Sequence, residues 1–187
     1  MQINFIRATQ ADLAFTHRLV NDPAFRAAYS QPESLQAMRE GTTALTNLPG
    51  VRQVHADVTI TPAALAGLPC EWFGDPGADG NRVILYLHGG AFIRGNLDLG
   101  RANASWLAQA SGCRVVAVAY RQAPEHPYPA ATDDVRRAWQ ALLDSGLDAR
   151  QVVVVGESSG GCLALGLAAR LAQEAQQAPP PAVAYPA

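Results

Sequence analysis

The sequence predicts an α/β fold in which a mostly parallel sheet is flanked by helices. Apolar runs of strand length alternate with segments of helical periodicity from residue 82 onward. Within residues 82–87, Arg82 is followed by a continuous apolar run at 83–87, which is typical of a strand buried on both faces. Residues 151–161, QVVVVGESSGG, then predict a strand, a tight turn and the start of a helix. Strands that alternate with helices favour parallel pairing through right-handed crossovers.

The composition excludes several classes of protein. A chain of 187 residues is long enough for one domain with a core, and a net charge of −2 offers no basic field for a nucleic acid. The longest apolar runs are far shorter than the roughly 18 residues of a membrane span, and no secretory signal is visible, so we expect a cytoplasmic protein. Three widely spaced cysteines fit neither a disulfide framework nor a zinc site, and we expect three core thiols.

The N-terminal part differs from the rest. Residues 1–48 are polar and helical in pattern, which predicts helices at 12–30 and 34–45 and no strand. We expect them to be separate from a main domain at 49–187. In that domain, the alternation at 51–60 predicts a half-exposed strand and 70–74 a second one, before a turn cluster at 74–81.

The remaining elements follow in regular order. We predict strands at 82–87, 114–120 and 151–155, alternating with helices at 99–110, 131–143 and 159–172. In the helix at 131–143, four apolar residues share one face because they recur at i, i+3, i+4 and i+7: Val135, Ala138, Trp139 and Leu142. A proline-rich stop follows the last helix, and the apolar residues 182–185 would begin another strand.

Ser158 is the candidate nucleophile. It lies at the apex of a G-x-S-x-G turn, between Gly156 and Gly160. Such a turn needs glycine on both sides, because the serine backbone is strained and a larger neighbour would clash with it. A strain of about 1–3 kcal/mol is tolerated where a side chain must be presented.

A serine nucleophile also needs donors for the oxyanion that it generates. The small residues at 88–92, HGGAF, follow the strand at 82–87, which places them at the same sheet edge as Ser158. Their backbone N–H groups can point into the site. The N–H of Ser159, at the start of the helix, supplies a further donor.

These residues resemble a known family. HGGAF at 88–92, YRQAPEHPYPAA at 120–131 and GESSGGCLA at 156–164 together resemble the hormone-sensitive-lipase-like (bacterial family IV) carboxylesterases of the α/β-hydrolase fold. The resemblance covers roughly residues 50–187 well. It covers the N-terminal helices loosely, where the family carries part of a cap over its active site.

The resemblance implies roles for particular residues. Ser158 matches the nucleophile, and the N–H groups of Gly90, Ala91 and Ser159 match the oxyanion hole, with Gly89 shaping the turn. Many members of the family have a third glycine at the position of Ala91, and Asp and Ala at the positions of Glu157 and Ser159. These three differences are mild, because the oxyanion donors are backbone groups.

The resemblance also implies that the two histidines near these motifs are structural. His126 matches a histidine that fixes a loop in the family. We expect a loop-fixing role for His88 as well.

The family's catalytic Asp and His follow the nucleophile in the chain. No Asp or His follows Ser158 here. We therefore expect a chain truncated at its C-terminus, with neither triad partner, that hydrolyses short-chain acyl esters slowly or not at all. No cofactor or metal is implied. An unfinished sheet favours self-association or a complementing C-terminal chain, since an open strand edge invites pairing.

Two other classes of protein are alternatives. Non-catalytic relatives of these esterases bind small molecules as receptors, and a chain without its base could do the same. VVVVG before a helix also resembles a dinucleotide turn superficially, but the G-x-G-x-x-G spacing fails at Ser158 and no phosphate-binding G-x-x-x-x-G-K-[ST] motif exists.

Overall fold

The computed structural model describes residues 21, 23, 35–46, 53–75 and 82–177. The chain divides into a unit at 1–40 and a unit at 41–187. Helix α3 (Leu35–Thr46) confirms the helix predicted at 34–45. The helix predicted at 12–30 and the strand predicted at 182–185 lie outside the described residues, apart from residues 21 and 23, which are helical.

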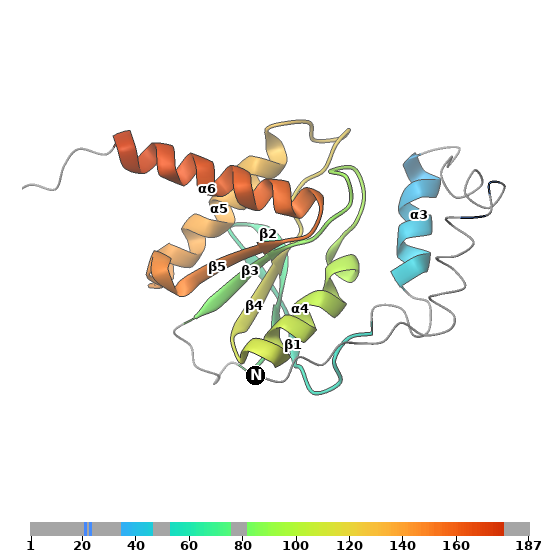
Figure 1. Ribbon diagram of the computed structural model, residues 1–187, viewed down its shortest axis with the longest axis horizontal. Helices are drawn as coiled ribbons and strands as arrows, with labels where there is room; N and C mark the ends of the chain where they lie inside the picture. Colours follow the sequence, from blue (N-terminus) through green and yellow to red (C-terminus); the bar gives the residue numbers. More distant parts are fainter. Residues whose placement is uncertain (1–20, 22, 24–34, 47–52, 76–81, 178–187) are drawn as a thin grey trace, which may run out of the picture. The chain divides into compact units, whose positions relative to one another are not determined.

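A five-stranded sheet forms the centre of the larger unit, with strand order β1-β2-β4-β3-β5 (Figure 1). The strands are β1 (Ile60–Leu65), β2 (Leu68–Phe73), β3 (Val83–Leu87), β4 (Arg114–Val118) and β5 (Val152–Gly156). Strand β3 pairs in parallel with β4 and with β5, whereas the β1–β2 and β2–β4 pairings are antiparallel. The predicted α/β fold is confirmed, with a sheet that is mixed.

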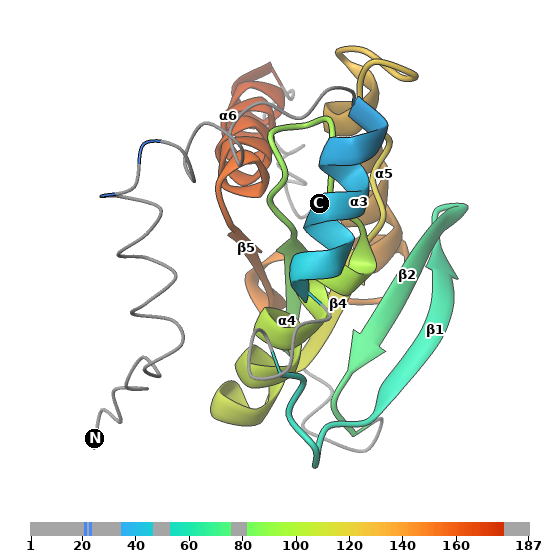
Figure 2. The same ribbon diagram turned by 90° about the vertical axis from the view of Figure 1, so that its right-hand side faces the viewer.

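Helices cover both faces of this sheet. Helix α4 (Leu97–Ser111) lies on one face, and α5 (Ala130–Asp144) and α6 (Ser159–Gln177) lie on the other (Figures 1 and 2). Strand β3 is buried on both faces, because Leu85 and Leu87 enter the core beneath α5 and α6 while Ile84 and Tyr86 enter the core beneath α4. The apolar face predicted for α5 is fully buried.

The strand predicted at 51–60 is wrong. Residues 53–59 form no strand, and β1 begins only at Ile60. The backbone of this segment bonds to α4 instead: Trp106 Nε1 donates to the Gln53 carbonyl at 3.0 Å, and the His55 N–H donates to Ser105 Oγ at 3.0 Å. The alternating sequence pattern of this segment does not show that side chains of helix α4, and not a neighbouring strand, supply the hydrogen-bond partners of these backbone groups.

The cysteine prediction holds for one residue only. Cys70 is buried in β2, Cys113 is partly buried and Cys162 is exposed on α6. Burial raises the pKa of the Cys70 thiol to about 11, so that thiol stays protonated.

A buried carboxylate anchors the loop that follows β4. Asp134, in the first turns of α5, is completely buried and accepts hydrogen bonds from the Arg121 backbone N–H at 2.9 Å and from the Arg121 guanidinium. Arg137 also donates to it. Burial by itself raises the pKa of Asp134, but the bonds from the two arginines outweigh it and hold the pKa below its usual value.

Asp134→Asn is therefore expected to reduce the free energy of unfolding by about 2–3 kcal/mol at pH 7, because charged hydrogen bonds are lost in a buried site. A carboxyl with a depressed folded pKa stabilises above its unfolded pKa of about 4, and this stabilisation is lost as pH falls through the folded pKa. The difference between wild type and variant, measured by urea unfolding, will shrink below pH 4. Asp133→Asn is the matched control, since Asp133 forms a half-exposed ion pair worth less than about 1 kcal/mol. A difference that is equal at pH 7 and pH 3 would contradict this role.

Candidate active site

Ser158 lies on a strained turn between β5 and α6, as predicted. Its φ of +52° falls in the left-handed region, and its side chain is exposed. Both flanking glycines are required because a side chain would clash with nearby backbone. A Cβ on Gly156 would lie 2.2 Å from the Gly160 carbonyl oxygen, and a Cβ on Gly160 would lie 2.0 Å from the Leu87 carbonyl oxygen. The close packing of these backbones presents the hydroxyl at the end of the sheet.

The turn after β3 lies directly against this serine. A Cβ on the buried Gly89 would lie 3.3 Å from Ser158 Cβ and 3.1 Å from the Glu157 carbonyl oxygen. The prediction that these two segments meet at one sheet edge is confirmed. Parallel pairing explains it, because β3 and β5 run side by side and end together at Leu87 and Gly156.

The turn itself has an unusual backbone. Gly90 has φ +133°, and the next two residues, Ala91 and Phe92, have φ +56° and +64°. The Gly90 carbonyl accepts hydrogen bonds from the N–H groups of Ile93 and Arg94, which closes the turn. A Cβ on Gly90 would lie 1.8 Å from the Arg94 carbonyl oxygen, so only glycine fits there.

Several backbone N–H groups at this end of the sheet, those of Gly90, Ala91 and Ser159 among them, donate to no acceptor within the described part of the chain. Ser159 is the first residue of α6, where helical N–H groups have no carbonyl partner in the helix and the helix dipole favours negative charge. The arrangement can therefore supply hydrogen bonds to an anionic oxygen formed beside Ser158.

The buried His88 side chain contacts the turn that follows β3. Its ring is 1% exposed, stacks on Tyr120 with centroids 4.4 Å apart and lies with Nδ1 2.7 Å from the Gly89 carbonyl oxygen. Burial lowers the pKa of His88, so the ring is neutral at neutral pH and Nδ1–H donates to Gly89. Burial raises the pKa of Tyr120 to about 12, and its hydroxyl donates to the His88 carbonyl at 2.7 Å. The loop-fixing role expected for His88 is consistent with these contacts.

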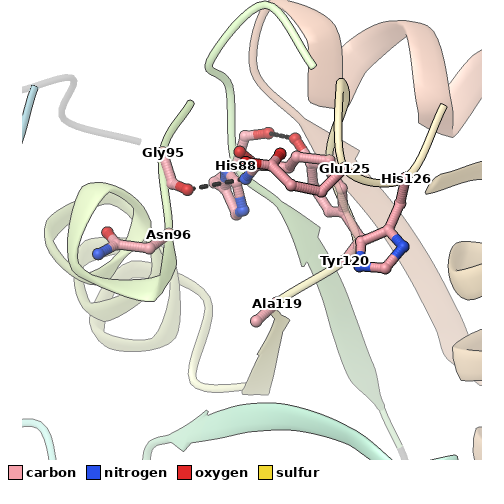
Figure 3. Close-up of a pocket in the computed structure, with 8 residues that line it drawn as sticks. His88, Gly95, Asn96, Ala119, Tyr120, Glu125 and His126 are labelled. Carbon is pink, nitrogen blue, oxygen red and sulfur yellow. Dashed lines mark hydrogen bonds between the residues drawn. The ribbon is translucent and has the colours of Figure 1, made fainter. Parts of the chain in front are cut away.

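Figure 3 shows the cavity that lies beside this stacked pair. It has a volume of about 350 Å³, and His88, Tyr120, Glu125 and His126 are among the residues that line it. The His126 side chain projects from the loop before α5, and the His126 backbone N–H donates to the Gln122 carbonyl at 2.9 Å. No hydrogen bond joins a histidine ring to the Ser158 hydroxyl in the ranges that the structure describes.

One contact network near the nucleophile was not foreseen. Glu157 Oε2 accepts hydrogen bonds from Asn103 Nδ2 at 2.7 Å and from the Tyr86 hydroxyl at 3.3 Å, which ties the turn to α4 and β3. The only local signal is an acidic residue beside the serine. Its partners are 54 and 71 residues away in sequence, so no local pattern indicates them.

A family model for the alpha/beta hydrolase fold matches residues 84–186, more than half of the chain. An esterase from Acinetobacter venetianus is 39% identical over 122 residues, which cover 65% of this chain and 40% of the relative. An ethyl acetate hydrolase from Pseudomonas putida is 38% identical over 132 residues, which cover 67% of this chain and 42% of the relative. The chain thus spans about two fifths of the length of these curated relatives.

Solved structures show the same likeness. A crystal structure of an esterase from the bacterial hormone-sensitive lipase family superposes with a TM-score of 0.72 and 30% identity, over 92% of this chain and 55% of that chain. EstE5, soaked with p-nitrophenyl butyrate, gives a TM-score of 0.69 and 31% identity, over 76% of this chain and 47% of that chain.

The described residues offer neither a metal-binding cluster nor a membrane-spanning helix. Those residues contain no group of three or more His, Cys, Asp or Glu side chains that could hold a metal ion. They also include no helix with the length and apolarity that a membrane crossing requires.

Proposed function

Because this chain belongs to the α/β-hydrolase family and resembles the hormone-sensitive-lipase esterases within it, we propose that it carries the nucleophile and oxyanion hole of a serine carboxylesterase for short-chain acyl esters. The observation that supports this most strongly is the strained Ser158, with φ +52°, packed against the turn at Gly89. A related esterase structure was soaked with p-nitrophenyl butyrate, and a curated relative is an ethyl acetate hydrolase, which favours ester substrates.

The proposed reaction has two steps. Ser158 Oγ attacks the ester carbonyl carbon, and the N–H groups of Gly90, Ala91 and Ser159 bind the oxyanion. The carbon–oxygen bond to the alcohol then breaks, the alcohol leaves with the proton that the serine hydroxyl gives up, and an acyl group remains on Ser158. Water attacks this acyl-serine and releases the carboxylic acid.

The rate of each step depends on a base. No Asp or His follows Ser158 among residues 159–187, and His126 is proposed to be structural. The loss of a triad histidine costs about 10⁶ in kcat, with about 10³–10⁴ over water remaining from the oxyanion hole and binding. We propose that the 187-residue polypeptide turns over esters slowly, and that deacylation is slow enough for the acyl-serine to accumulate.

Intact-mass measurement tests the proposal. After incubation with p-nitrophenyl butyrate, an activated ester whose leaving group needs no proton, we expect one butyryl group per polypeptide on Ser158. Steady release of p-nitrophenol is expected to stay close to background. Saturable binding of an ester without acylation would favour the receptor alternative instead.

We also propose that this polypeptide self-associates or pairs with a complementing chain. Within the described ranges β5 pairs only with β3, so no described strand pairs with its other edge. Val153 on β5 is 55% exposed and Leu165 on α6 is 74% exposed. An apolar strand edge of this kind favours pairing with another chain. Size-exclusion chromatography with light scattering is expected to show masses above the monomer's, and a monomer that persists on concentration would contradict this.

A further inference from the structure

The cavity of Figure 3 lies at the carboxyl ends of β3 and β4. Its lining comes from three segments: His88 at the end of β3, the residues that lead into α4, and the loop that follows β4. Neither Ser158 nor any of residues 89–92 is among the described residues that line it, so it is separate from the site proposed for the ester. Its volume of about 350 Å³ gives room for a molecule of roughly ten non-hydrogen atoms.

A buried nitrogen of one lining residue lacks a partner. His88 Nε2 forms no hydrogen bond within the described part of the chain. The other ring nitrogen, Nδ1, lies 2.7 Å from the Gly89 carbonyl oxygen, which can only accept, so Nδ1 carries the proton of the neutral ring. Burial lowers the pKa of His88 and keeps the ring neutral, which makes Nε2 an acceptor. Because a buried acceptor without a donor is costly, this wall suits a ligand that supplies one.

Most of the other polar groups in the wall are acceptors as well. The Gln122 side chain donates through Nε2 to the Gly95 carbonyl at 2.7 Å, and the oxygen end of the same amide is an acceptor. The Tyr120 hydroxyl gives its proton to the His88 carbonyl. Glu125 adds a carboxylate, whereas no arginine is among the described lining residues and the chain contains no lysine. The lining is therefore negative and rich in acceptors.

The N-terminal end of α4 borders the same cavity, and a helix N-terminus by itself favours an anion. Here the Asn96 side chain accepts a hydrogen bond from the Leu99 N–H at 3.2 Å, and Asp98 adds a negative charge in the first turn. These two residues offset the positive end of the helix. An anion in the cavity would also be repelled by the Glu125 carboxylate, so a cation is the better occupant.

We propose that this cavity binds a small primary ammonium ion, which donates one N–H to His88 Nε2 and places its charge near the Glu125 carboxylate. An –NH₃⁺ group has three donors and no acceptor, which matches a wall of acceptors. Hydrogen bonds from a charged donor are stronger than neutral ones, so the ion is a better occupant than an alcohol of the same size. Its organic part packs against Ala119 and the Tyr120 ring. Binding involves no covalent step and does not depend on the chemistry proposed for Ser158.

Titration calorimetry of the 187-residue polypeptide with n-butylammonium chloride tests the proposal, with sodium chloride at equal ionic strength as the blank. We expect saturable binding of one ion per polypeptide. 1-Butanol has a donor but no charge, and tetramethylammonium has the charge but no N–H, so each is expected to bind about tenfold more weakly or not at all. In ¹⁵N NMR of the histidine-labelled polypeptide, the Nε2 resonance of His88 is expected to move upfield as n-butylammonium binds.

Two substitutions test whether the ion lies in this cavity. Ala119→Leu, which fills the cavity, is expected to weaken binding of n-butylammonium by about tenfold or more. Glu125→Gln, which removes the negative charge of an exposed side chain, is expected to weaken it by about fivefold. Ala110→Leu is the matched control, because Ala110 is exposed on α4 outside the cavity, and it is expected to bind like the wild type. Thermal unfolding of each variant checks that it is folded.

Several results would overturn the proposal. Equal affinity for tetramethylammonium or 1-butanol would do so, because His88 Nε2 would then need no charged donor. Binding that neither Ala119→Leu nor Glu125→Gln weakens would place the ion elsewhere, as would a shift of the His126 ring nitrogens with none at His88. An absence of saturable binding would mean that the cavity holds only water. None of these results bears on acylation of Ser158, which intact mass measures separately.

Discussion

Ser158→Ala is expected to abolish covalent acylation of the polypeptide by p-nitrophenyl butyrate, to below about one hundredth of the wild-type amount. The reason is that the acyl group is transferred to the serine oxygen, which alanine lacks, while the oxyanion donors remain. The measurement is intact mass followed by peptide mapping of residues 157–170. Alanine removes the hydroxyl of an exposed side chain, and its Cβ can occupy the same left-handed backbone, as it does at Ala91. Unfolding is therefore not expected to explain the loss.

Few other groups in this sequence compete with Ser158 for an activated ester. It contains no lysine, so the amines that usually compete for activated esters are limited to the N-terminus. The exposed thiol of Cys162, one helical turn from Ser158, is the main competing nucleophile, and Cys162→Ala removes it. Ser111→Ala, at the exposed end of α4, is the matched control and is expected to acylate normally. Butyryl groups that persist in Ser158→Ala and are lost in Cys162→Ala would contradict the assignment of the nucleophile.

Much of this site could be predicted because its signals are local and steric. A glycine two residues before Ser158 and another two residues after it mark a turn in which a Cβ at either position would clash with backbone, and the run of β-branched residues before it predicts a strand. Parallel pairing then places the turn after β3 beside it, as the contact between Gly89 and Ser158 confirms. Strand β3 was predictable for a similar reason, because a strand buried on both faces must be apolar throughout.

The errors have the opposite origin, since they depend on contacts between distant segments. Residues 53–59 alternate like a strand, yet α4 satisfies the backbone at Gln53 and His55. The Asp134 carboxyl anchors Arg121, thirteen residues earlier, through side-chain bonds that periodicity does not encode. The link from Glu157 to Asn103 is of the same kind.

Gly160→Ala is expected to lower the free energy of unfolding by about 3 kcal/mol or more. The new Cβ would lie 2.0 Å from the Leu87 carbonyl oxygen and 2.7 Å from the His88 carbonyl oxygen. These are backbone atoms at the end of a buried strand, so they cannot move aside as a flexible side chain can, and the helix must shift instead. In a chain of this size the change corresponds to a fall in Tm of roughly 6–12 °C.

Gly166→Ala is the matched control on the same helix, because an added Cβ there meets no atom within 4 Å. It is expected to stabilise the protein by roughly 0.5–1 kcal/mol, since alanine is the better helix former. The two substitutions add the same methyl group to α6. The opposite signs of their effects on the free energy of unfolding therefore separate helix propensity from the contact with β3. Because a shift of α6 also moves the Ser159 N–H away from the turn at Gly90, Gly160→Ala should slow acylation of Ser158 by at least tenfold. A Gly160→Ala variant as stable and as readily acylated as Gly166→Ala would show that α6 does not depend on this close approach to β3 for its position.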